Sequence, residues 1–149
     1  IISNMNDQIK VSIASDHAGF DLKAEIIKYL KDNEIDVIDR GPNIKEPVDY
    51  PDFASKVTQD IINQSAQKGV LVCGTGQGMA MAANKKPGIR AALCYNDELA
   101  KLARKHNNAN ILTLGARVIN QNTALNVVNT FLNTNFEGNR HIERINKIG

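Results

Sequence analysis

The sequence predicts a three-layer α/β fold, in which a five-stranded parallel sheet carries helices on both faces. Two observations lead to this fold class. Five short apolar runs alternate along the chain with segments whose apolar residues recur at helical spacing. One of these runs, Val70–Cys73, is apolar throughout, which is typical of a strand buried on both faces. Helical crossovers between successive strands favour a parallel, Rossmann-like arrangement.

The first half of the chain contains two strands, each followed by a helix. Leu22, Ile26 and Leu30 recur at helical spacing after the first strand, with lysines on the opposite side. Pro51 is compatible with the second helix because proline is tolerated in a first turn. The predicted elements are a strand at Lys10–Ser15, a helix at Phe20–Lys31, a strand at Ile35–Ile38, a loop at Asn43–Tyr50 and a helix from Asp49–Asp52 to about Gln64.

The second half of the chain repeats the alternation. Asn96 is a good helix cap, and Asp97 and Glu98 in the first turn suit the helix dipole. The predicted elements are strands at Val70–Cys73, Arg90–Tyr95 and Ile111–Leu114, and helices at Met79–Asn84, after Asn96, from an Asn122 cap to about Leu132, and from about Arg140 to Ile148.

Length and composition exclude several classes of protein. The chain has 149 residues, which predicts one domain with its own core; residues 1–9 are expected to form a polar N-terminal tail. A net charge of +2 offers no basic field for nucleic acid, and no apolar run could span a membrane. Two cysteines are too few for a disulfide framework, and the polar start has no secretory signal. We therefore expect a cytoplasmic protein with reduced thiols.

A loop with three glycines, Gly74-Thr75-Gly76-Gln77-Gly78, follows the buried strand. Ligands of parallel α/β sheets bind at the carboxyl ends of the strands, and N–H groups at a helix start bind anions. Met79 stands where a dinucleotide fingerprint needs glycine and where a cysteine phosphatase loop needs arginine. The Gly-Lys-Ser/Thr of a P-loop is also absent. The loop is either an anion site of another kind or a structural turn.

The two cysteines differ in position. Cys73 ends the apolar strand and opens the glycine loop, where N–H groups of a helix start favour the thiolate. It is a candidate base or nucleophile, or else a small buried hydrophobe. Cys94 lies inside a predicted strand, so we expect a buried side chain without a chemical role.

Histidines and C-terminal arginines complete the candidate residues. His17 follows the first strand and so belongs to the predicted ligand edge, whereas His106 ends a helix, where a positive charge suits the dipole. Arg140 and Arg144 share a helix face; they could clamp a phosphate or form a solvated basic end. No two histidines have a metal-ligand spacing on one helix, so no metal site is expected.

Several motifs of the chain, in this order, resemble the ribose-5-phosphate isomerase B family, which also includes galactose-6-phosphate and allose-6-phosphate isomerases. The resemblance covers about Lys10 to Ile148. The motifs are Ser15–Phe20, Asp49-Tyr50-Pro51, Cys73–Gly78 with Ala82–Lys85, His106-Asn107, Gly115-Ala116-Arg117, and Gly138–His141 with Arg144.

The resemblance implies an aldose–ketose isomerase that interconverts ribose 5-phosphate and ribulose 5-phosphate through a cis-enediolate, without a metal or organic cofactor. It further implies a homodimer whose sites draw on both subunits. By position, Cys73 would be the base and His106 the acid that opens the sugar ring. The other roles would be oxyanion binding by the N–H groups of Gly74, Thr75, Gly76, Gln77 and Gly78, sugar binding by Asp16, Thr75 and Asn107, and phosphate binding by His17, Arg117, Arg140 and Arg144.

Some positions depart from the family pattern. In one branch of the family the base is a glutamate inside the loop; Met79 takes that position here, which leaves Cys73 as the candidate base. Gln77 replaces a frequent aliphatic residue, and Ala80 a common serine. The alternatives are an isomerase of a six-carbon sugar phosphate and a non-catalytic phosphosugar-binding module. A nucleotide-binding protein is disfavoured by the spacing at Met79.

Overall fold

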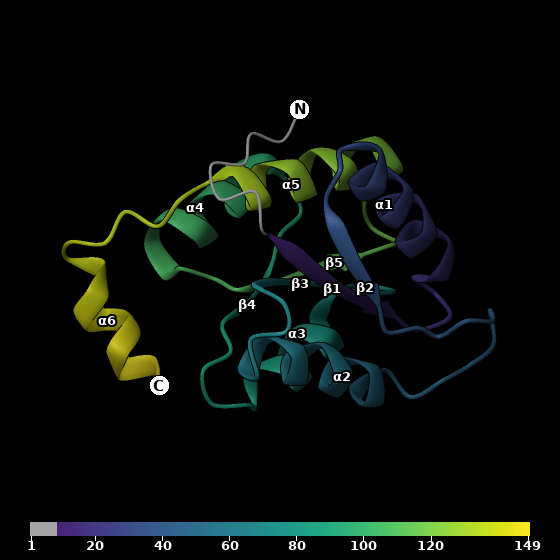
Figure 1. Cartoon of the computed structure of the whole chain (residues 1–149), viewed down its shortest axis with the longest axis horizontal. Coiled ribbons are helices and arrows are strands. Elements are labelled where there is room, and N and C mark those ends of the chain that lie inside the picture. Colours follow the sequence, from purple (N-terminus) through teal and green to yellow (C-terminus); the bar gives the residue numbers. More distant parts are fainter. Residues whose placement is uncertain (1–8) are drawn as a thin grey trace.

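The computed structural model describes residues 9–149, so nearly all of the predicted tail lies outside the described residues. Its sheet has five strands in the order β2-β1-β3-β5-β4, and every neighbouring pair is parallel, which confirms the predicted fold class (Figure 1). The elements are β1 Lys10–Ser15, α1 Phe20–Asp32, β2 Asp36–Asp39, α2 Tyr50–Ile62, β3 Lys68–Cys73, α3 Gln77–Asn84, β4 Ala91–Leu93, α4 Asp97–Asn107, β5 Ile111–Gly115, α5 Gln121–Asn133 and α6 His141–Ile148.

Helices cover both faces of the sheet and create two apolar layers. In Figure 1, α1, α4 and α5 lie above the sheet and α2 and α3 below it. Alternate residues of β3 point into different layers: Val70 and Val72 pack with the first group, and Leu71 and Cys73 with the second. This alternation explains why the whole run is apolar, and it directs Cys73 toward α2 and α3.

The strand order places a topological switch point between β1 and β3. The chain leaves β1 toward α1 on one face and leaves β3 toward α3 on the other face. Such a switch point separates the two loops and is where open α/β sheets bind ligands. The loops that follow Ser15 and Cys73 therefore form the expected ligand edge.

Some predicted boundaries are wrong. The cap of α5 is Asn120, whose side chain accepts a hydrogen bond from the Thr123 N–H at 2.8 Å; Asn122 instead lies inside the first turn. Both asparagines suit a cap, and apolar spacing does not separate them. The fourth strand is also shorter than predicted, because an edge strand has a ladder partner on one side only. Among the described residues, no helix has the length and apolar character needed to cross a membrane.

Candidate active site

The glycine loop needs a glycine at position 76, both for its backbone conformation and for the space around it. Gly76 is the cap residue of α3 and has a φ of +83°. A Cβ there would lie 2.5 Å from Leu93 Cδ1, so substitution would be strained sterically as well as conformationally. On the opposite side, a Cβ on Gly115 would lie 2.6 Å from the carbonyl carbon of Thr75. The loop is therefore held tightly against the end of β5.

The sulfur of Cys73 faces the donors of this loop. The Gly76 N–H donates to Cys73 Sγ at 3.2 Å, and the side chain is 5% exposed. A backbone N–H at a helix start stabilises negative charge on sulfur. Both alternatives that the sequence left open for Cys73 therefore apply. Its side chain packs in the apolar layer that contains Met79, and its sulfur still accepts a hydrogen bond from the glycine loop.

Cys94 is buried, as the sequence predicts, but it follows β4 rather than lying inside the strand, which ends at Leu93. It is 1% exposed, and burial raises its pKa to about 12. Burial therefore disfavours the thiolate of Cys94, in keeping with a packing role.

The ligand edge also contains the Asp16–Gly19 turn. Asp16 Oδ1 accepts from the Gly19 N–H at 3.0 Å, and the Asp16 N–H donates to Val72 O at 3.1 Å, which holds the turn beside β3. The next residue, His17, has a buried Nδ1 that makes no hydrogen bond to any residue the structure describes. Both predicted residues therefore lie at the same edge as Cys73.

Arg117 and Tyr50 approach the glycine loop from two other elements. The Arg117 N–H donates to Gly74 O at 2.9 Å, and a Cβ on Gly74 would lie 3.1 Å from Arg117 Nη1. A Cβ on Gly78 would lie 2.6 Å from the Tyr50 ring. Tyr50 belongs to a motif that supports the family resemblance, but sequence reasoning gave it no place in the site. The contact with Gly78 brings it there.

The remaining predicted residues lie at the other end of the sheet. Helix α4 runs back from the carboxyl ends of the strands, and His106 and Asn107 form its last turn. The loop that follows is fixed at the start of β3, since the Gly69 N–H donates to Asn110 O at 2.9 Å. From Gly69 to Cys73 there are four residue steps, or about 13 Å at the usual rise of a strand.

Helix α6 stands on the same side as the last turn of α4. In Figure 1 it lies at the left, whereas β1 points to the right. Arg140 precedes this helix and Arg144 lies within it, and both are exposed. The predicted site residues of one chain therefore form two groups at opposite ends of the sheet. One holds Asp16, His17, Cys73–Gly78 and Arg117, and the other holds His106, Asn107, Arg140 and Arg144.

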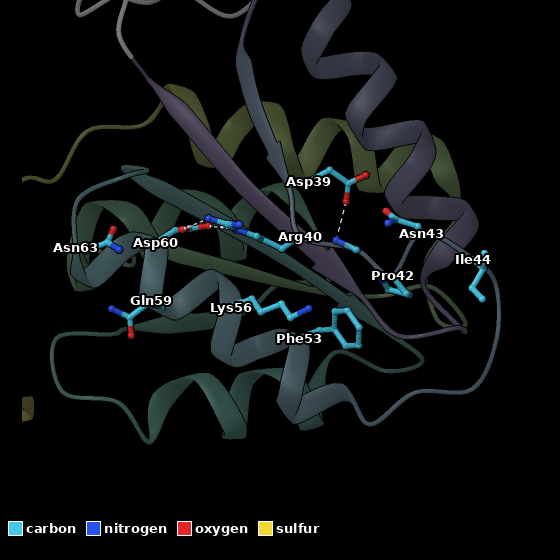
Figure 2. Close-up of a pocket in the computed structure, with 11 residues that line it drawn as sticks. Asp39, Arg40, Pro42, Asn43, Ile44, Phe53, Lys56, Gln59, Asp60 and Asn63 are labelled. Carbon is cyan, nitrogen blue, oxygen red and sulfur yellow. Dashed lines mark hydrogen bonds and ion pairs between the residues drawn. The ribbon is translucent and has the colours of Figure 1, made fainter.

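A cavity of about 800 Å³ lies apart from both groups, between the end of β2 and the outer side of α2 (Figure 2). A bidentate ion pair stands at its side: Arg40 Nε lies 2.8 Å from Asp60 Oδ2, and Nη2 lies 2.7 Å from Oδ1. The Ser12 hydroxyl also donates to Asp60 at 2.7 Å. Hydrogen bonding to Arg40 lowers the pKa of the Asp60 carboxyl. Because these groups satisfy one another, we assign the pair a structural role.

Comparisons with known proteins agree with the fold. The model of the Ribose/Galactose Isomerase family matches residues 11–148. A ribose 5-phosphate isomerase of Thermotoga maritima has a crystal structure that superposes with a TM-score of 0.93 at 53% identity, covering 94% of this chain and 97% of that one. Ribose-5-phosphate isomerase B of Clostridium thermocellum gives a TM-score of 0.94 at 48% identity, covering 95% of each chain.

The family match spans almost the whole described chain, so this protein belongs to the ribose/galactose isomerase family. Ribose-5-phosphate isomerase B of Escherichia coli is 40% identical over 139 residues, which is 93% of each chain. A protein of Rickettsia conorii is 49% identical over 138 residues, which is 93% of this chain and 96% of that one. It is named as a sugar phosphate isomerase, and the name does not specify the sugar.

Proposed function

We propose that the chain is an aldose–ketose isomerase that interconverts ribose 5-phosphate and ribulose 5-phosphate, a reaction of the non-oxidative pentose phosphate pathway. The observation that carries this proposal is the hydrogen bond from the Gly76 N–H to Cys73 Sγ, at the switch point of the sheet. It places a group that can take a proton beside donors that can hold an oxyanion. A base that is a free thiol also needs a reducing compartment, which favours the cytoplasm.

The proposed reaction moves one proton between neighbouring carbons. The Cys73 thiolate takes the proton from C2 of the open-chain aldose, and the electron pair of that bond forms a cis-enediolate. The negative charge first lies on O1, and the hydroxyl proton of O2 then passes to O1. As the thiol returns its proton to C1, the electrons on O2 form the C2=O2 double bond, which gives the ketose. The N–H groups of Gly74–Gly78 stabilise the charge on oxygen, and each such donor typically contributes about 3–4 kcal/mol to the transition state.

Binding of the phosphate and ring opening require the second group of residues. In this proposal His17 and Arg117 bind the phosphate from the edge of Cys73, while Arg140 and Arg144 bind it from the other group. His106 opens the furanose ring, and Asp16, Thr75 and Asn107 bind sugar oxygens. The ring-opening acid and the base act on neighbouring atoms of the sugar, so His106 and Cys73 of one site cannot lie a strand length, roughly 13 Å, apart. A second copy of the chain must therefore bring its His106 group to the Cys73 edge, and we propose a homodimer with two shared sites.

Substitution of Cys73 tests the base. We expect Cys73→Ala to lose isomerisation by several orders of magnitude while ribose 5-phosphate still binds, and Cys94→Ala, the matched control, to keep normal turnover. Near-normal kcat in Cys73→Ala would refute the assignment. A parallel assay with allose 6-phosphate distinguishes the five-carbon substrate from the six-carbon alternative.

Mixed dimers test the shared site. Cys73→Ala and His106→Asn are prepared separately, and the two proteins, both impaired on ribose 5-phosphate, are then combined and allowed to exchange subunits. If each site takes Cys73 from one subunit and His106 from the other, every mixed dimer holds one intact site, and activity returns. If both residues act within one chain, mixing restores nothing.

A further inference from the structure

The second group of residues contains a cluster of three metal-ligand side chains: His106, Glu137 and His141. One ligand atom from each lies within 4.8 Å of the other two. The cluster comes from the last turn of α4, the segment before α6 and the first residue of α6. The three residues do not share one helix, so spacing along a helix does not predict this arrangement.

His141 gives the strongest indication of a ligand. It is 6% exposed, and its Nε2 makes no hydrogen bond to any residue the structure describes. Glu137 Oε1 lies 3.4 Å from this nitrogen, within the range of an ion pair but without the direction of a hydrogen bond. Buried polar atoms without a partner are uncommon, and a bound ion is one recognised explanation.

The cluster is also held together independently of any metal. The rings of His106 and His141 stack with centroids 4.4 Å apart and an interplanar angle of 19°. The Glu137 N–H donates to Lys105 O at 3.0 Å, which ties the segment before α6 to the last turn of α4. The backbone contact thus brings the three side chains together without a metal. The stack must open when one ion binds both imidazoles, because the nitrogen lone pairs of nearly parallel rings do not point to a common position.

We propose that His106, Glu137 and His141 form a site for a zinc ion, with an open fourth position. Two imidazoles and one carboxylate are ligands that zinc accepts, and imidazole disfavours magnesium and calcium. Zinc bonds of about 2.0–2.1 Å in a tetrahedron separate ligand atoms by about 3.4 Å. The separation of at most 4.8 Å must therefore shrink by about 1.4 Å, which rotation of the half-buried His106 ring and the exposed Glu137 carboxylate provides.

Metal binding at this site has a consequence that rests on the proposed function. A nitrogen of His106 that coordinates zinc cannot give a proton to the ring oxygen of the sugar. Zinc therefore inhibits turnover of the ring-closed substrate, and removal of zinc by a chelator restores it. In this way the free-metal level regulates an isomerase that itself needs no metal.

Direct binding of zinc tests the site without reference to activity. All proteins carry Cys73→Ser so that the thiol does not compete, and zinc chloride is titrated against a chromogenic chelator. We expect one zinc per chain, and at least about tenfold weaker binding in Glu137→Gln and in His141→Phe, whose ring preserves the stack. Glu143→Gln is the matched control, since it removes an exposed charge from α6 and leaves binding unchanged.

Zinc binding at the cluster and inhibition of turnover by zinc are tested separately. Absence of zinc binding, or equal binding in all these variants, would overturn the site. Loss of binding in His17→Asn but not in His141→Phe would overturn it as well, because it would place the metal at the Cys73 edge. With Cys73 intact, Glu137→Gln should need at least about ten times more zinc for half-inhibition. Binding without inhibition would overturn the regulatory consequence. An enzyme inactive on sugar phosphates without zinc would instead refute the proposed function.

Discussion

Gly115 and Thr75 touch through their backbones: a Cβ on Gly115 would lie 2.6 Å from both the carbonyl carbon and the carbonyl oxygen of Thr75. Gly115, the last residue of β5, therefore supports the glycine loop through a direct backbone contact. Neither backbone can move without shifting the loop, so the position of the proposed oxyanion donors depends on the absence of a side chain at 115.

The first prediction concerns the contact between Gly115 and Thr75. Gly115→Ala should lower kcat by about 100-fold, since a displacement of about 1 Å at a catalytic group has an effect of that size. Steady-state kinetics with ribose 5-phosphate gives the measurement. Gly88→Ala is the control: a Cβ there meets nothing within 4 Å, although φ is +84°. It should cost about 1 kcal/mol of stability and no activity. If both variants kept the same kcat, the contact between Gly115 and Thr75 would have no catalytic importance.

The second prediction separates ring opening from proton transfer. His106→Asn should slow turnover of ribose 5-phosphate far more than turnover of an analogue that cannot form a ring, because only the ring-closed sugar needs the acid. General acid catalysis typically contributes about 100- to 10,000-fold, which sets the expected difference between the two substrates. Equal losses on both substrates would remove the ring-opening role and leave His106 as a binding residue.

The third prediction concerns the ion pair of Arg40 and Asp60 beside the cavity of Figure 2. Asp60→Asn should lower the free energy of unfolding at pH 7 by about 1–2 kcal/mol, since charged hydrogen bonds to a buried group are lost. The pKa of the Asp60 carboxyl is lowered in the folded chain, so its contribution exists above the ordinary value of 3.8 and disappears as pH falls through the lowered pKa. Urea unfolding at several pH values should therefore show the two proteins converging in acid.

A matched control is available at an exposed pair. Lys45 Nζ lies 2.7 Å from Asp21 Oδ2, but both side chains are more than half exposed. Asp21→Asn should leave stability unchanged within experimental error, because solvent screens such pairs. A loss as large as that of Asp60→Asn would mean that burial does not determine the strength of these pairs.

The fold and the Cys73 edge could be predicted because both depend on local patterns. A continuous apolar run identifies β3, and the glycines that follow it identify the loop. The cluster of Glu137 with His141 and His106 could not be predicted, since it joins a segment outside regular structure to another helix. The separation of His106 from Cys73 is different: alternation of strands and helices already implies that a helix end and a strand end lie at opposite edges. The order of strands and helices therefore implies this separation, whereas the order of the motifs along the chain does not.

The last prediction uses Lys68, at the start of β3. Burial, together with repulsion from Arg104, lowers the pKa of this ammonium to about 8. Below pH 8 both the folded and the unfolded chain hold the proton, so the folded state bears the whole desolvation cost. Between about pH 8 and the ordinary pKa of 10.5, only the unfolded chain keeps the proton, and stability rises with pH across that interval.

Lys68→Met should therefore stabilise the protein at pH 7 by about 1–2 kcal/mol, less than the full shift because the side chain is partly solvated. Its advantage should shrink toward zero by pH 10.5 in urea unfolding, whereas Lys101→Met, at an exposed position of α4, should show no such trend. A constant difference between Lys68→Met and the unaltered chain at all pH values would show that methionine acts by packing rather than by removing a charge.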